Sequence, residues 1–415
     1  MSPSPRAAWA LVAIALLALV VPPLVASLLA VAVLTASVID AFTGRSAPAL
    51  DARFPRILSR SVPEDYTITA QPPGATSVHL RQARVPDVEL RPQGGETSVT
   101  GKITGQRRGR HRLPPVGMRV DGPLRLGRWF HRGAGNTEVL VYPNLHAARR
   151  IALAVRKGRF GDPGKLTRGP LGLGTDFESI REYLPDDDIR QVNWRATARM
   201  ERPMSNQYRV ERDRDVICVV DCGRLMASPV GGGTRLDAAL DAAVAVALVA
   251  DVVGDRAGAI AFDSVIRRDI KARRAGGDRV VHGLFDLEPT TTDSDYELAF
   301  RSVAGGKRSL VIVLTDLLDV AAARTLLDAV PLLSRRHMVI VASVLDTDLQ
   351  EATAREPRTT HDVYAAAVAL DVFSSKANVA AHLRRSGADV IEAAPASLGA
   401  ACVRGYLRAK SRGRL

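Results

Sequence analysis

Cysteine is scarce in this chain of 415 residues, which holds only Cys218, Cys222 and Cys402. The number is odd, and the first two lie in or directly after an apolar run, where a framework of disulfide bonds does not fit. We therefore expect free thiols and a reducing compartment rather than a secreted protein stabilised by disulfides.

Known catalytic and metal-binding spacings are also lacking. The eight histidines are scattered, and none stands in a spacing such as His-x-x-x-His. Ser-His-Asp, Cys-His and His-Glu-x-x-His arrangements are not apparent. No Gly-Lys-Ser/Thr follows Gly172-Leu173-Gly174, so a phosphate-binding loop is not indicated. These absences argue against an enzyme, and we expect the protein to act by binding.

Aromatic residues make up only 5% of the chain, although its net charge is +13. The excess positive charge lies in residues 41–214, which hold 31 Lys and Arg against 18 Asp and Glu, whereas residues 215–415 hold 25 of each. Proteins that bind single-stranded nucleic acid present several aromatic side chains along a basic groove. We expect no nucleic-acid partner, since charge alone would support only binding that weakens steeply with salt.

Charge is missing altogether from residues 7–39, a run of 33 residues composed mainly of Ala, Val, Leu and Ile. Such a run predicts a membrane segment. One straight helix of this length would measure about 50 Å, more than the roughly 30 Å of a hydrocarbon core, so we expect a break at Pro22-Pro23. The sequence favours a transmembrane helical hairpin over residues 7–40, with one kinked, tilted span as the alternative.

The charges that flank this run predict its orientation. Arg45, Arg53, Arg56 and Arg60 follow it, whereas only Arg6 precedes it, and positive charge collects on the cytoplasmic side of membrane segments. We expect a cell-membrane protein whose soluble domains face the cytoplasm. A cleaved signal peptide is the alternative, but its apolar stretch spans about 7–15 residues after a basic start, and this run is more than twice as long.

The region after the apolar run predicts a small all-β, sandwich-like domain over residues 55–150. Short alternating runs such as 66–69 and 139–142 are separated by Pro and Gly clusters, which is typical of a β-sandwich. The basic residues 107–112 either contact anionic lipid near the membrane anchor or form a solvated turn.

A connecting segment over residues 165–212 is dense in glycine and in charge of both signs. The three aspartates 186–188 follow Pro185, which is typical of a solvated turn or of the start of a helix. We expect the charged residues to form an ionic network that holds this segment to the next domain. The alternative is a cryptic hydrolase that uses acidic and basic residues of 172–199 as acid and base.

This segment resembles the signature of a bacterial family called domain of unknown function 58. The matching residues are Asp176, Phe177, Arg181, Glu182, Tyr183, Pro185, Asp187, Asp188, Arg190, Trp194, Ala198 and Arg199. Asp186 replaces the usual glycine of that signature, and Val192 replaces the usual isoleucine.

The resemblance implies the layout of that family, in which a membrane hairpin, a β region and the signature precede a von Willebrand factor A-like domain. It also implies a partnership with a MoxR-type AAA+ ATPase and with other membrane proteins. The expected function is therefore that of a scaffold in the assembly or maturation of membrane or envelope complexes, with the signature as an interaction surface.

Residues 213–415 predict an α/β domain of the Rossmann type, consistent with a von Willebrand factor A-like fold. Continuous apolar runs alternate with helical stretches such as 234–253, as in parallel sheets that are covered by helices. The apolar runs are 216–220, 257–262, 309–314 and 338–344.

Two aspartates follow such runs, Asp221 after the first and Asp316 after a later one, where the ligands of parallel sheets gather. In the von Willebrand A fold the first position opens an Asp-x-Ser-x-Ser motif that binds Mg²⁺. Residues 221–225 instead read Asp-Cys-Gly-Arg-Leu, so the likeness implies a degenerate metal-ion-dependent adhesion site that lacks both serine hydroxyls. Mg²⁺ needs several oxygen ligands. We therefore expect no cofactor. The two carboxylates should instead cap a helix or pair with arginine, and a weakened Mg²⁺ site is the alternative.

Overall fold

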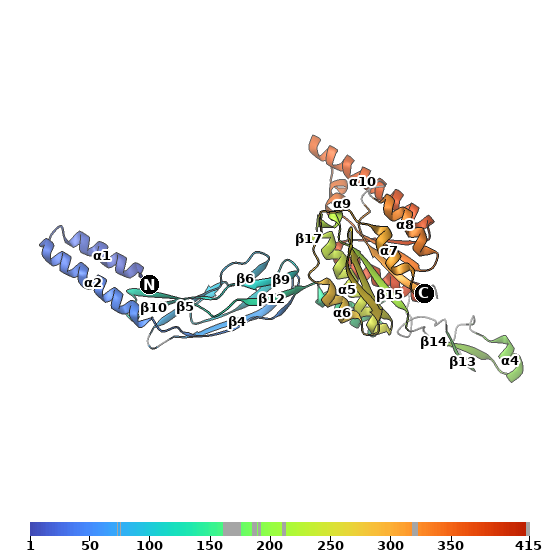
Figure 1. The fold of residues 1–415 in the computed structure, drawn as a ribbon, viewed down its shortest axis with the longest axis horizontal. Coiled ribbons are helices and arrows are strands. Elements are labelled where there is room, and N and C mark those ends of the chain that lie inside the picture. The colour runs from blue at the N-terminus through green and yellow to red at the C-terminus, as the bar shows by residue number, and fades with distance from the viewer. Residues whose placement is uncertain are drawn as a thin grey trace. The chain divides into compact units, whose positions relative to one another are not determined.

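A computed structural model describes residues 1–411 apart from 73, 75, 161–175, 185–188, 190–191, 210–212 and 318–322. The chain divides into two compact units, Met1–Tyr142 and Pro143–Leu415 (Figure 1). The first unit holds apolar helices and several β-sheets, and the second is an α/β region. The predicted multidomain organisation is confirmed at this level.

The apolar run folds into two helices, α1 (Pro5–Leu17) and α2 (Pro23–Thr43), which contact each other. The break falls at the expected prolines, because a proline inside a helix removes a hydrogen bond, whereas a proline at the first position fits the start of α2. Within the described part of the chain, α2 is the one helix that is long and apolar enough to cross a membrane.

The described strands of the first unit form sheets of five, three and four strands. Their orders are β1-β11-β10-β5-β7, β3-β12-β9 and β2-β4-β8-β6. The bounds are β1 (Ser2–Pro3), β2 (Ala49–Arg53), β3 (Ile57–Ser59), β4 (Pro63–Gln71), β5 (Ser77–Arg81), β6 (Val88–Arg91), β7 (Gly94–Gly95), β8 (Ser98–Gly105), β9 (Gly109–Leu113), β10 (Gly117–Asp121), β11 (Gly127–Arg132) and β12 (Thr137–Tyr142). Inward-facing side chains from all three sheets, such as Ile68, Val120 and Val141, share one core.

The end of α2 is joined to the five-stranded sheet by hydrogen bonds. The buried Asp40 carboxylate accepts hydrogen bonds from the backbone N–H groups of Leu124, Leu126 and Gly127, at 2.8–2.9 Å. Gly127 permits this close approach, because an added Cβ would lie 2.2 Å from the carbonyl oxygen of Ser37. The apolar helices therefore belong to the same unit as the sheets.

The basic residues 107–112 lie in β9 and in the turn that precedes it. β9 pairs with β12, and both lie at the end of the first unit that is remote from α1 and α2 (Figure 1). The basic cluster is therefore not close to α1 and α2, although closeness to the anchor was the reason to expect lipid contact there.

The second unit is built on a six-stranded sheet of order β19-β18-β15-β20-β21-β22. Its strands are β15 (Asp215–Asp221), β18 (Arg256–Phe262), β19 (Ile266–Arg273), β20 (Ser309–Leu314), β21 (Met338–Val344) and β22 (Asp389–Ala393). All neighbours run parallel except β19, which is an antiparallel edge strand. The four apolar runs predicted as strands are confirmed as β15, β18, β20 and β21. The two edge strands carry more charge and lack the continuous apolar pattern.

One face of this sheet is covered by α5 (Arg235–Val253), which is buried on nearly all sides. It can be apolar all round because α3 (Leu145–Arg156), α6 (Gly277–Leu284) and α11 (Pro395–Ser411) pack around it. Thr234 and Asp237 form a capping box at its start, and Gly254, with φ +86°, ends it. The strands of the first unit end at Tyr142, and α3 belongs to the second unit.

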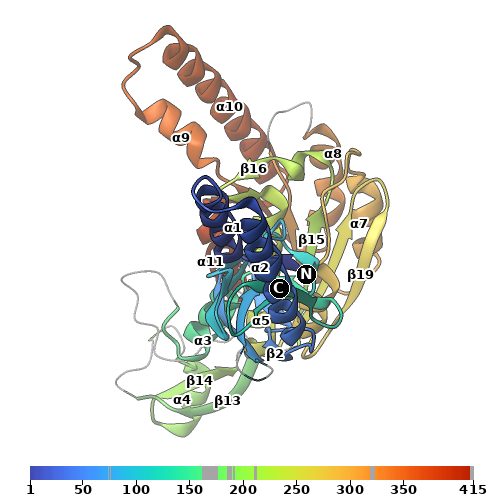
Figure 2. The same ribbon diagram turned by 90° about the vertical axis from the view of Figure 1, so that its left-hand side faces the viewer.

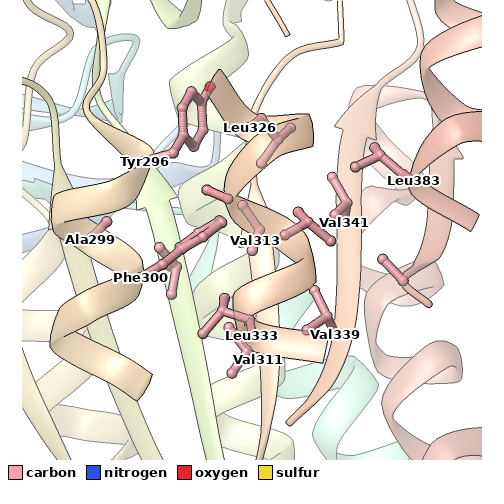
Figure 3. Packing of buried hydrophobic residues seen from close by; sticks show 14 of the residues in the cluster. Tyr296, Ala299, Phe300, Val311, Val313, Leu326, Leu333, Val339, Val341 and Leu383 are labelled. Carbon is pink, nitrogen blue, oxygen red and sulfur yellow. The ribbon is translucent and has the colours of Figure 1, made fainter. Parts of the chain in front are cut away.

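The other face is covered by α7 (Tyr296–Ala304), α8 (Arg324–Ser334) and α10 (Thr360–Arg385). Figure 2 shows α7 and α8 on one side of β15, with α3 and α11 on the other. Side chains from these helices, among them Phe300, Leu333 and Leu383, pack on the valines of β20 and β21 (Figure 3). The described remainder consists of η2 (Arg224–Ala227), β16 (Pro229–Val230), β17 (Gly233–Thr234), α9 (Thr347–Ala354) and a segment with β13 (Asp176–Glu182), α4 (Trp194–Met200) and β14 (Met204–Arg209).

Candidate functional site

The carboxyl ends of β15 and β20 lie side by side where the chain order of the strands reverses. β15 pairs with β18 on one side and with β20 on the other, and open parallel sheets bind their ligands at such a point. Asp221 is the last residue of β15, and Asp316 follows β20 closely. Both aspartates are buried, so the predicted pair of carboxylates lies at this edge of the sheet.

Neutral hydrogen-bond donors surround the carboxylate of Asp221. The hydroxyls of Tyr296 and Thr315 each lie 2.7 Å from Oδ2, and the hydroxyl of Ser294 donates to Oδ1. The N–H of Gly223 also donates to Oδ1, at 2.8 Å. Burial, and then the negative charge of Asp221, raise the pKa of Tyr296 well above its ordinary value, so Tyr296 keeps its proton and donates. The protein itself thus satisfies both oxygens of Asp221.

Gly223 stands where the expected motif carries its first serine. A Cβ at this position would lie 2.1 Å from the hydroxyl oxygen of Ser294. The hydroxyl that residues 221–225 lack is therefore supplied by Ser294, from the segment before α7. The polar run 290–295, which reads Thr-Thr-Thr-Asp-Ser-Asp, is the sequence signal for this contact, and it lies outside the motif at 221–225.

Cations of the protein neutralise Asp316. Arg235 Nη1 lies 2.9 Å and Lys376 Nζ 3.4 Å from its Oδ1. The side chains of all three residues are at most 4% exposed. Arg235 also pairs with Asp346, with 3.0 Å between Nη2 and Oδ2. Of the two roles expected for these carboxylates, pairing with arginine is the one that Asp316 takes.

This arrangement places protein cations where a bound metal would otherwise balance the carboxylates. Within the described ranges, no group of three or more His, Cys, Asp or Glu side chains is placed to hold a metal ion. Arg224, the charge that the sequence adds to the motif, points elsewhere: its exposed guanidinium pairs with Asp293. At this edge, protein cations thus balance Asp316 and neutral donors satisfy Asp221, while Asp316 Oδ2 is buried without a hydrogen-bond partner among the described residues.

The signature segment forms a two-stranded sheet of its own. β13 (Asp176–Glu182) pairs antiparallel with β14 (Met204–Arg209), and α4 (Trp194–Met200) lies between them in the chain. Asn193 fixes the start of α4: its side chain accepts a hydrogen bond from the N–H of Ala196 and donates to Asn206 at 2.8 Å. We refer to β13, α4 and β14, together with the described residues that connect them, as the signature lobe.

The predicted signature residues are distributed over this lobe. Asp176, Phe177, Arg181 and Glu182 lie in β13, Tyr183 follows it, and Trp194 and Arg199 lie in α4. Pro185, Asp187, Asp188 and Arg190 lie outside the described residues, as do the side chains of Asp176 and Phe177. Glu182 pairs with Arg202, a residue that the sequence did not single out. This ion pair is exposed and internal to the lobe, so it does not hold the lobe to the next domain.

Large apolar side chains of the lobe are exposed to solvent. Trp194, the first residue of α4, is 70% exposed. Among the side chains of this segment that the structure describes, Ile180, Leu184, Ile189 and Met200 are also exposed, and the arginines at 195, 199 and 202 are exposed as well. A surface that combines tryptophan, aliphatic side chains and arginine is typical of a protein-binding site.

Comparison with known proteins yields a family match. The family described as "Protein of unknown function DUF58" matches residues 179–387, which is just over half of the chain. Two curated relatives are the uncharacterized proteins Rv1480 of Mycobacterium tuberculosis and Mb1516 of Mycobacterium bovis. Each is 26% identical over 217 residues, 49% of this chain and 66% of the relative, so the match spans just under two thirds of their length.

Solved structures give only weak likenesses. A superoxide reductase (neelaredoxin) from Ignicoccus hospitalis is 12% identical, with a TM-score of 0.15, over 23% of this chain and 83% of that one. WR4, a member of the MSP family from C. elegans, is 10% identical, with a TM-score of 0.15, over 23% and 96%. At such scores neither likeness carries an argument about fold or function.

Proposed function

Since this chain belongs to the family of unknown function DUF58, we propose that it is a membrane-anchored scaffold that works by binding other proteins. The observation that carries the proposal is the exposure of Trp194 and its apolar neighbours on the signature lobe. Burial of exposed apolar surface drives association, and tryptophan and arginine are the side chains that contribute most to protein interfaces.

The anchor in this proposal is a membrane hairpin formed by α1 and α2. The N–H of Ser4, before α1, donates to the carbonyl of Leu126, and Asp40, near the end of α2, accepts from the N–H of the same residue. Both ends of the helix pair are thus bound to one turn of the sheet, which favours a hairpin over a single kinked span. The apolar residues of the connection, Leu19 and Val20, are more than 80% exposed, which suits a lipid environment.

The cytoplasmic orientation follows from flanking charge. Four arginines follow the apolar run within residues 45–60, and one precedes it. In this orientation the second unit, which includes the signature lobe, faces the cytoplasm, where an ATPase partner has access to it.

The second unit of the proposed scaffold is a von Willebrand factor A-like domain that recognises partners without a metal. The strand order, and an aspartate at the end of β15 with hydroxyls around it, support the likeness. Arg235 and Lys376 beside Asp316 support the absence of Mg²⁺, because a divalent cation would have to enter beside two buried positive charges. Binding therefore takes place through the surface rather than through a shared metal ion.

The partner class we propose is a MoxR-type AAA+ ATPase, with other membrane proteins as clients. This choice rests on the family resemblance of the signature. Affinity capture of the membrane-extracted full chain, with and without Mg²⁺ and ATP, followed by mass spectrometry, tests it. Recovery of an AAA+ ATPase supports the proposal.

A matched pair of variants locates the surface. Trp194→Ala removes the exposed aromatic side chain of the lobe, and Tyr364→Ala removes one of nearly equal exposure, 69% against 70%, from α10. We expect the first variant to lose the captured ATPase and the second to keep it. Equal capture by both variants, or no ATPase with the wild-type chain, would contradict the proposal.

A further inference from the structure

A groove of about 880 Å³ lies on the five-stranded sheet of the first unit. Strands β5, β10 and β11 and the short edge strand β7 line it. Three arginines, two histidines and one carboxylate, that of Glu96, are among the lining residues. The lining is therefore net positive.

One cross-strand row of this groove alternates glycine and arginine. Arg81 lies opposite Gly94 on one side and opposite Gly117 on the other, and Gly117 in turn lies opposite Arg132. Directly opposed residues of antiparallel strands project from the same face. Because β10 separates the two arginine-bearing strands, Arg81 and Arg132 stand about 10 Å apart, with no side chain between them at Gly117.

The neighbouring row supplies an aromatic side chain. It holds His79, Arg119 and Phe130. Arg119 lies 3.3 Å and Arg128 3.2 Å from the carboxylate of Asp121, and His79 lies 3.3 Å from it, so each of these side chains already has an anionic neighbour. Phe130 is 56% exposed, although it has large apolar surface to bury.

The charges that stay available are those of Arg81 and Arg132. Both residues are exposed, and neither is in an ion pair with a residue that the structure describes. The guanidinium fork donates two parallel hydrogen bonds to phosphate oxygens, and two such forks on either side of a glycine suit a doubly charged anion. We propose that this groove binds a phosphate ester, with the phosphate above Gly117 and the organic part against Phe130.

Position along the strand favours a soluble ester over a phospholipid of the bilayer that holds α2. Gly117 lies four residues along β10 from Asp121, which adjoins the turn that Asp40 holds, so it stands about 14 Å further out. The headgroup layer of a bilayer is only about 5–8 Å thick on each side. The phosphates of ordinary diacyl lipids therefore do not reach Arg81 and Arg132.

Titration of the full-length protein in phosphatidylcholine nanodiscs with phenyl phosphate tests the site, with inorganic phosphate as the second probe. We expect saturable binding of phenyl phosphate, tighter than that of inorganic phosphate because Phe130 contacts the ring. The double variant Arg81→Gln/Arg132→Gln should bind at least about tenfold more weakly. The control Arg112→Gln removes an exposed arginine of β9 in the same unit and should bind within about twofold of the wild type.

A second variant fills the groove without changing charge. A Cβ at Gly117 would lie 3.4 Å from its nearest neighbour, the carbonyl oxygen of Arg81, so Gly117→Val fits the strand and should also weaken binding at least about tenfold. Absence of saturable binding by the wild type, or equal weakening by Arg112→Gln, would overturn the site. Competition by phosphatidic acid built into the nanodisc would overturn the soluble source. All of these outcomes are independent of ATPase capture.

Discussion

Arg235 and Asp316 form a buried ion pair, with 2.9 Å between Nη1 and Oδ1 and neither side chain more than 4% exposed. The pair joins the first residue of α5 to the loop after β20. Lys376 from α10 completes the charge balance of Asp316, and Asp346 before α9 that of Arg235. Four segments that are far apart in the chain thus meet at one edge of the sheet.

Removal of one member of this cluster should destabilise the second unit strongly. In Arg235→Met, Asp316 and Asp346 lose their shared cation inside the protein, and breaking a buried pair costs about 3–5 kcal/mol. We expect a fall in the Tm of the full chain in detergent of roughly 6 °C or more. The control Arg301→Met breaks an exposed pair with Glu297 on α7 and should change the free energy of unfolding by less than about 0.5 kcal/mol. Similar changes in Tm for both variants would show that the buried pair contributes no more to stability than the exposed pair.

Magnesium should leave the stability of the protein unchanged. A ligand that binds the folded state alone at 100 times its dissociation constant adds about 2.7 kcal/mol, which a thermal scan detects easily. Because hydroxyls saturate Asp221 and two cations flank Asp316, we expect the same Tm with Mg²⁺ and with a chelator. A rise in Tm that the chelator reverses would restore the metal site.

Asp40→Ala should detach the helix pair from the sheet. The substitution leaves the N–H groups of Leu124, Leu126 and Gly127 without their acceptor, and each unsatisfied buried donor costs about 1–3 kcal/mol. Hydrogen exchange at these three amides in nanodiscs should become much faster. Asp51→Ala, which breaks an exposed pair with Arg53, is the control, and unchanged protection in Asp40→Ala would refute the coupling.

His337 should make the protein sensitive to acid. Burial lowers the pKa of this histidine, and the nearby backbone of Ala304 only partly offsets that effect; neither ring nitrogen has a hydrogen-bond partner among the described residues. Below the ordinary histidine value near 6.5, the unfolded chain takes up a proton that the folded chain resists, so stability falls with falling pH until the folded pKa is passed. The fall in Tm between about pH 7.5 and 5.5 should shrink in His337→Gln. The exposed His361→Gln should retain the full fall; an equal fall in all three proteins would exclude His337 as the cause.

The three cysteines should be unreactive in the folded protein. All three are buried, free thiols. Burial raises the pKa of Cys402 to about 12 and that of Cys218 well above its ordinary value, and the thiolate is the reactive form. A chromogenic disulfide reagent at neutral pH should therefore release little colour from the folded chain and the equivalent of three thiols in denaturant. Rapid reaction of one thiol in the folded state would contradict the burial.

Local patterns accounted for most elements of this fold. The prolines at 22 and 23 interrupted an apolar run and did separate two helices, and four continuous apolar runs became the buried parallel strands. The edge strands β19 and β22 escaped prediction because one side of each lacks a partner strand and so tolerates charge. Both aspartates were found from the sequence, since each directly follows a recognisable strand.

The partners of those aspartates had no local signal. Neither Arg235, the first residue of a helix, nor Lys376, within a long helix, is marked by any motif, and Ser294 came to Asp221 from a loop that the motif does not include. The same holds for the groove, because Arg81, Gly117 and Arg132 are ordinary residues until strand register places them in one row.

The sequence by itself determined where helices and strands form, which segment is apolar enough for a membrane, and the family signature, because these depend on neighbours a few residues apart. Only the tertiary structure decided that protein cations and hydroxyls, rather than open carboxylates, fill the edge of the sheet. It also decided that Trp194 is left exposed while Asp40 is enclosed. The physical reason is that charge balance and burial depend on which segments pack together, and packing joins residues whose separation along the chain carries no pattern.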